Sequence, residues 1–146
     1  MHFRIALAVA AVACLGACAT APSPAPKDWK AVPGASGAWT LGSGATAQLY
    51  RYSKQQFGGT LQDLASRIAI DALMQHSGAR FGGSLPFGPC PGEAGVATFA
   101  LPGGRTLQSA FAVRDGQSIR IEYQRPMGVR PDPDAGQAMQ ASLCRL

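Results

Sequence analysis

Few side chains in this sequence are of the types that carry out chemistry. There are four cysteines and two histidines, His2 and His76, and the only glutamates are Glu93 and Glu122. The motifs G-x-S-x-G and H-E-x-x-H, the P-loop and the EF-hand loop are all absent. A catalytic triad would have to use His76, and a zinc site would need carboxylates for most of its ligands. We therefore expect no enzymatic activity, no metal and no cofactor, with a carboxylate pair assembled by the fold as the open alternative.

The N-terminal residues have the pattern of an export signal. Arg4 precedes an apolar run, Ile5 to Ala13, that is too short for a transmembrane helix and typical of a signal peptide. The run leads into Leu15-Gly16-Ala17-Cys18, which resembles the lipobox of bacterial lipoproteins. The resemblance implies cleavage before Cys18 and a lipid on its sulfur, and Ala19 at the next position implies the outer membrane, facing the periplasm. An ordinary cleaved signal with a chance cysteine is the alternative.

Removal of the signal peptide, residues 1–17, would leave 146 − 17 = 129 residues with a charge of 12 − 8 = +4. Residues 18–37 then form the lipidated cysteine and a tether. Its prolines favour an extended polyproline II chain with a rise of about 3.1 Å per residue. Trp29 is the one large aromatic side chain in this segment. We expect Trp29 to dock on the domain rather than to lie at the membrane interface.

The remaining residues, 38–146, are predicted to form one globular domain. Residues 38–41 and 47–53 predict a hairpin around Gly42-Ser43-Gly44. The same glycines fit the dinucleotide pattern G-x-G-x-x-A, but the alternating aromatic residues after them predict a strand where that motif needs a helix. Residues 60–77 have helical apolar spacing, and Thr60 with Asp63 forms a capping-box-like pair at the start.

Residues 96–124 predict three antiparallel strands with turns at 102–105 and 114–116. A two-residue turn at Asp115-Gly116 would place the large apolar residues of the last two strands on opposite faces. A three-residue loop instead pairs Phe111 with Ile119 on one face, so we expect that register. A second helix is predicted to begin after Asp132, with Asp132 as its cap and Pro133 at its first position.

These elements predict an α+β fold, an antiparallel sheet of about five strands with both helices packed on one face. The domain contains two cysteines, Cys90 and Cys144, and export to an oxidising compartment favours a disulfide between them over two free thiols. The bridge would close a loop of about 55 residues and hold the last helix against the Pro/Gly-rich segment 85–92.

Three arginines, Arg105, Arg114 and Arg120, lie near the predicted turns of the three-stranded unit. They could contact an acidic lipid headgroup, a lipopolysaccharide phosphate or an acidic protein. Arg120 beside Glu122 equally fits an ordinary solvated strand face. The envelope location disfavours nucleic acid as a partner.

Two functions follow from these features. The first is an outer-membrane lipoprotein whose small periplasmic domain binds another envelope component, a protein, glycan or lipid headgroup, through its sheet face or through residues 81–92. The second is an envelope hydrolase or an enzyme inhibitor with an unrecognised site. A deep pocket lined by Glu93, Glu122 or His76 would favour the second.

Replacing the lipobox cysteine, Cys18→Ala, is expected to move the protein from the membrane fraction to the soluble fraction. The reason is that lipid anchoring depends on buried acyl chains, at about 0.8 kcal/mol per CH2. Cell fractionation with immunoblotting measures this, and Cys14→Ala is the control that keeps the anchor. Protein that stays membrane-bound after Cys18→Ala contradicts the lipobox prediction.

Overall fold

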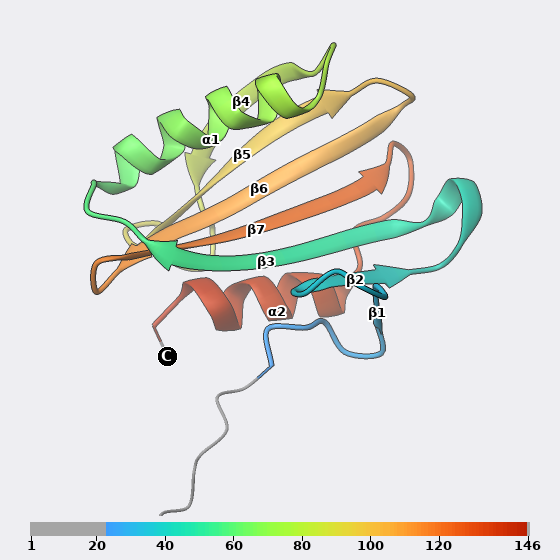
Figure 1. Ribbon diagram of the computed structural model, residues 1–146, viewed down its shortest axis with the longest axis horizontal. Helices are drawn as coiled ribbons and strands as arrows, with labels where there is room; N and C mark the ends of the chain where they lie inside the picture. The colour runs from blue at the N-terminus through green and yellow to red at the C-terminus, as the bar shows by residue number, and fades with distance from the viewer. Residues whose placement is uncertain (1–22, 146) are drawn as a thin grey trace, which may run out of the picture.

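A seven-stranded antiparallel sheet runs through the part of the chain that the computed structural model describes, residues 23–145 (Figure 1). Cys18 and the rest of the predicted signal and lipobox lie outside the described residues. The strands are β1 (Lys30–Ala31), β2 (Ala38–Leu41), β3 (Gln48–Gln56), β4 (Arg80–Pro86), β5 (Ala94–Leu101), β6 (Arg105–Arg114) and β7 (Gln117–Pro126). The helices are α1 (Leu61–Gln75), α2 (Pro133–Leu143) and the short 3-10 turn η1 (Gly44–Thr46).

The strands lie in the order β1-β2-β3-β7-β6-β5-β4, and each neighbouring pair is antiparallel. The α+β class is confirmed, and the sheet has two strands more than the expected five or so. β1 is only two residues long. β4 escapes a sequence pattern because it contains Gly82, Gly83 and Pro86, residue types that are depleted in strands, and because a bulge between Phe81 and Gly83 interrupts its alternation.

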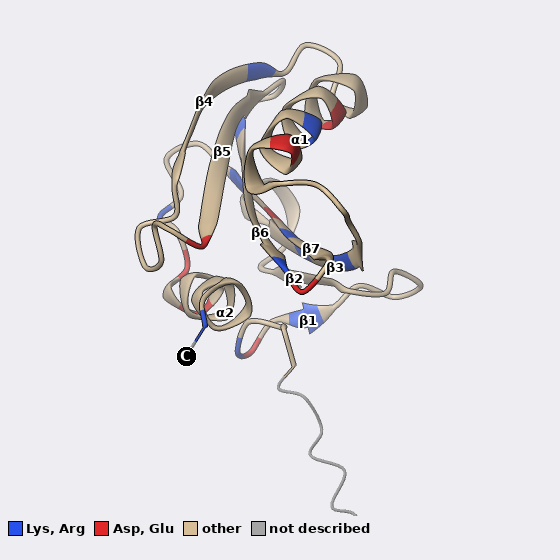
Figure 2. Cartoon of the chain, turned by 90° about the vertical axis from the view of Figure 1, so that its left-hand side faces the viewer, with Lys and Arg blue, Asp and Glu red and all other residues tan. Residues whose placement is uncertain are grey.

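The two helices cover opposite faces of the sheet, so the prediction that both pack on one face is wrong. Leu64 and Ile68 of α1 are buried against Phe99 and Leu107. A second cluster joins α2 to β7 on the other face, and its largest members include Ile121, Tyr123, Met139 and Leu143. Figure 2 shows the sheet curving around α1, with α2 outside the curve. The middle of β6 is therefore buried on both sides, and each side of the sheet has its own core.

The pairing of β6 with β7 follows from this arrangement and corrects the predicted register. Arg114 pairs with Gln117 across a two-residue turn, Asp115–Gly116, and Phe111 pairs with Arg120 rather than with Ile119. Both turn residues have positive φ, 52° and 72°, as the tightest hairpin turns require. Placing Phe111 and Ile119 on opposite faces is favourable here because each face is covered by a helix.

Helix α1 begins as the sequence predicts. The Thr60 hydroxyl accepts from the Asp63 backbone N–H at 3.1 Å, and the Asp63 carboxylate accepts from the Thr60 N–H at 2.8 Å. The backbone N–H of Thr60, and then its hydroxyl, lower the pKa of Asp63. Gly78 follows the helix with φ 82°, a conformation that glycine adopts at little cost.

The folded part begins before residue 38, where the sequence boundary was placed. The predicted docking of Trp29 is confirmed, because its side chain is 8% exposed and lies edge-on to Tyr50 and Tyr123, with ring centroids 6.0 Å apart in both pairs. The indole N–H donates to the carboxylate of Asp132. Asp132 precedes α2 at the predicted cap position, but its side chain makes no capping hydrogen bond. Residues 29–31 thus belong to the domain rather than to a tether.

Because the two cores are separate, we expect substitutions in one core and in the other to have additive effects on the free energy of unfolding. Ile68→Val on α1 and Ile121→Val on β7 are each expected to lower the free energy of unfolding by about 1 kcal/mol, because both side chains are fully buried. The double variant should equal the sum of the two within about 0.5 kcal/mol, as measured by urea denaturation. A larger coupling would contradict the assignment of these residues to opposite faces.

Candidate functional site

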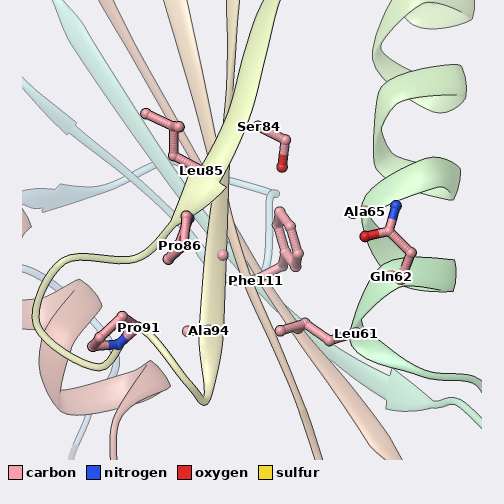
Figure 3. A pocket seen from close by; sticks show the side chains of 10 residues that line it. Leu61, Gln62, Ala65, Ser84, Leu85, Pro86, Pro91, Ala94 and Phe111 are labelled. Carbon is pink, nitrogen blue, oxygen red and sulfur yellow. The ribbon is translucent and has the colours of Figure 1, made fainter.

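A groove without charged side chains separates α1 from the edge strand β4. Two cavities of about 360 and 390 Å³ make up this groove, and they share Gln62, Ala65 and Ser84. Figure 3 shows Leu61, Gln62 and Ala65 on the α1 side, with Ser84 opposite and Phe111 between them. Every described residue that lines the two cavities is apolar, small or an uncharged polar residue.

The groove stays open because small residues border it. Ala65 and Ala69 present only methyl groups from α1, and Ser84 is the groove-facing side chain at the middle of β4. At Gly95, below the groove, a Cβ atom would lie 2.6 Å from the ring of Phe111. Gly95 therefore leaves room for the Phe111 ring, which closes the groove from below.

Strand β4 forms one edge of the sheet and pairs only with β5. Phe81 is 49% and Leu85 70% exposed, so two large apolar side chains lie beside the edge. An edge strand presents unpaired backbone N–H and C=O groups that can pair with another strand. The opposite edge, β1, offers only two residues. β4 is therefore the longer of the two open edges of the described sheet.

The loop after β4 forms the end wall of the groove, and Cys90 lies in this loop. The sulfurs of Cys90 and Cys144 are at disulfide distance, 2.14 Å, and their Cα atoms are 5.6 Å apart, which agrees with the predicted pairing. The carboxylate of Glu93 also accepts from the backbone N–H of Arg145 at 2.9 Å. Pro91 and Ala94, on either side of Glu93, line the groove. The wall is thus held to the end of α2 at two points.

A separate cavity of about 420 Å³, called the polar cavity below, differs from the groove because charged side chains line it. It lies on the α1 side of the sheet over β3 and β7, and its charged lining residues are Arg51, Arg120 and Glu122. The loop between β1 and β2 forms one wall, and Gln75 at the end of α1 forms another. This cavity shares no lining residue with the groove between α1 and β4.

The three arginines of the sequence prediction do not come together. Arg105 and Arg114 lie at opposite ends of β6, nine residues apart, or about 30 Å along a strand. Arg105 donates to the carbonyl of Ala47 and Arg114 to the carbonyl of Leu143. Arg120 pairs with Asp71 and Glu122. Each has an intramolecular partner, and contact of these arginines with an anionic partner stays a prediction.

The candidate catalytic residues are also dispersed. Glu122 lines the polar cavity. Glu93 lines another cavity, of about 310 Å³, and these two cavities have no lining residue in common. His76 ends α1 and lines neither. Within residues 23–145, no three His, Cys, Asp or Glu side chains are close enough to hold a metal ion.

Residues 81–92, one of the two binding surfaces that the sequence suggests, supply most of β4 and the end wall of the groove, and binding there stays a prediction. The sequence does not indicate that Ala65 and Ala69 line a groove, because alanines on a helix cannot be told apart from the rest of its apolar side. Arg51 was missed because its neighbours Glu122 and Arg120 come from a distant strand.

Comparisons with protein-family models, with curated proteins and with solved structures found no match for this chain. Neither helix within residues 23–145 is long and apolar enough to cross a bilayer.

Removal of the Cys90–Cys144 link is expected to loosen the end wall of the groove. The double variant Cys90→Ser/Cys144→Ser should lose about 2–5 kcal/mol of unfolding free energy, because the unfolded chain is no longer cross-linked. Hydrogen exchange of the Cys90 and Ala94 amides, which donate within the loop, should speed up more than that of β6. Two free thiols in the denatured, unreduced wild-type domain would show that no link is present.

Proposed function

We propose that this chain is a lipid-anchored protein of the outer membrane whose periplasmic domain is a non-enzymatic binding module. Its ligand is an extended segment of another envelope protein, bound along β4 at the groove beside α1. The observation that carries this proposal is the open edge of β4 next to an uncharged groove.

An extended polypeptide suits both parts of this surface. Its backbone can pair with the free edge of β4, and every second side chain then points toward the α1 side of the sheet. The groove on that side accepts apolar side chains because no charged residue lines it. The bulge at Phe81–Gly83 and Pro86 interrupt the edge, so it favours a short segment over unlimited sheet extension.

The position of the groove also suits a tethered binding module. The described chain enters beside α2 and β1, whereas β4 lies at the far edge of the sheet (Figure 1). Six strand spacings of about 4.8 Å separate β1 from β4, or up to about 29 Å. A lipid at Cys18 would therefore hold the domain with β4 away from the membrane, where a periplasmic partner can reach it.

Hydrolysis is the second candidate, because Glu122 lines a cavity of about 420 Å³. The surroundings of Glu122 favour binding instead. Glu122 already pairs with Arg120 at 2.7 Å, and Arg120 pairs in turn with Asp71 at 3.4 Å. Hydrolysis by paired carboxyl groups needs a second carboxylate in the same cavity, and Glu122 is the one carboxylate among the described residues that line it.

The peptide-binding proposal is tested with Ser84→Arg, which puts a charge into the uncharged groove from an exposed position. Peptides selected from a random library on the wild-type domain should bind Ser84→Arg at least tenfold more weakly, measured by fluorescence anisotropy. Ser77→Arg is the matched control, an exposed serine that lines none of the cavities described above.

Bound peptide should also protect β4 amides from hydrogen exchange, because strand addition pairs the free edge. Selected peptides that bind both variants equally, or that leave β4 unprotected, would overturn the proposal. Turnover of an envelope polymer by the purified domain, lost in Glu122→Gln, would favour the hydrolase instead.

A further inference from the structure

Helix α1 leaves β7 and β3 uncovered on the face of the sheet that it packs on, which we call the inner face. The helix packs on β4, β5 and β6, while β7 and β3 continue the same face with polar side chains. Arg120 and Glu122 of β7 lie on this face, directly across from Ser53 and Arg51 of β3. The cavity of about 420 Å³ lies over these four residues. This face differs from the groove in both lining and charge.

The charges in this cavity are arranged in two parts. Within the cavity, Nη2 of Arg120 lies 2.7 Å from the carboxylate of Glu122; Nη1 also lies 3.4 Å from Asp71, which does not line the cavity. The side chains of Arg120 and Glu122 are both 14% exposed, which holds them at the bottom of the cavity. Arg51 is exposed and forms no ion pair with the described residues. The floor therefore carries one paired arginine and carboxylate, the mouth carries one arginine that is unpaired within the described chain, and the three charged lining residues together carry one net positive charge.

The cavity wall opposite α1 is fixed by the backbone. Gly37 has φ 69°, and a Cβ atom there would lie 2.6 Å from the carbonyl oxygen of Tyr52. The Tyr52 backbone N–H donates to the Gly37 carbonyl at 2.8 Å. Only glycine permits this approach, so residues 35–38 are held against β3 before any ligand binds.

We propose that this cavity binds an acidic saccharide, a sugar unit that carries one carboxylate. Sugar hydroxyls donate hydrogen bonds, and the carboxylate of Glu122 is an acceptor at the floor. The carboxylate of the sugar accepts from Arg51 at the mouth. Ser53, Gln75 and Ser36 add uncharged groups that both donate and accept.

The lining argues against other ligands. The only small apolar side chains in the cavity are those of Ala35 and Ala38, too few for an acyl chain or for apolar peptide side chains. The one net positive charge of the lining balances a single negative charge on a ligand and not the two of a phosphate group. A ligand rich in hydroxyls with a single negative charge matches both the acceptors and the cation.

The test uses a panel of hexuronate oligosaccharides of different stereochemistry and their methyl esters, which keep the shape and lose the charge. We expect at least one acidic member to bind the full domain, with its methyl ester at least tenfold weaker by calorimetry. Arg51→Gln should weaken binding to the same degree. Arg80→Gln, at an exposed arginine on β4, is the matched control and should bind as wild type.

A second variant, Ser53→Trp, fills the cavity from an exposed strand position and should abolish binding while thermal melting shows a folded domain. Amide NMR shifts on titration should fall on residues 35–38, β3 and β7. Absence of binding by every acidic member, equal affinity for an ester, or equal binding by a monoanionic peptide of similar size would overturn the proposal. Ser84→Arg should leave saccharide binding unchanged, so the outcome is independent of the peptide groove.

Discussion

The tight turn at Asp115–Gly116 sets the pairing of β6 with β7, and the rest of the domain depends on that pairing. With Arg114 opposite Gln117, Phe111 and Arg120 share the inner face, while Ile119 and Ile121 share the outer face. Shifting the pairing by one residue would move Ile119 and Ile121 to the inner face and Arg120 against α2. Glu122 would move with Arg120, and both charges would be buried there without Asp71, which costs several kcal/mol, so the register is strongly specified.

This register divides the inner face into two surfaces. On β5 and β6 the face is apolar and covered by α1, with Phe99, Leu107 and Phe111 below the helix. On β7 and β3 it is polar and open, with Arg120, Glu122 and Arg51. The groove and the polar cavity therefore lie on either side of the same helix, and α1 contributes Ala65 to one and Gln75 to the other.

The outer face is closed by α2 and by the N-terminal segment together. Trp29 fills the space beside α2 over Tyr50 and Tyr123, and Asp132 receives its indole hydrogen bond. Asp132 also donates its backbone N–H to the Tyr123 hydroxyl at 2.9 Å. Burial raises the pKa of the Tyr123 phenol, and the phenol stays a neutral hydrogen-bonding group at ordinary pH. The N-terminal segment, the start of α2 and β7 thus meet at one point, while the Cys90–Cys144 pair holds the far end of α2.

Some elements followed from the sequence because short-range physics specifies them. Thr60 and Asp63 satisfy the first backbone groups of α1, Asp132-Pro133 marks the start of α2, and Trp29 is too apolar to remain in water. Export to an oxidising compartment favours a disulfide between the two cysteines of the domain over two free thiols.

Tertiary structure alone decided which face each helix covers, and hence the register of β6 with β7. Phe111 fits either register when the sequence is considered alone, because β6 is buried on both faces and has no polar side to fix its orientation. The groove and the polar cavity depend on the same placement of the helices and the same strand register. They bring Ala65 next to Ser84, and Arg51 next to Glu122, through contacts between distant parts of the chain that no local pattern encodes.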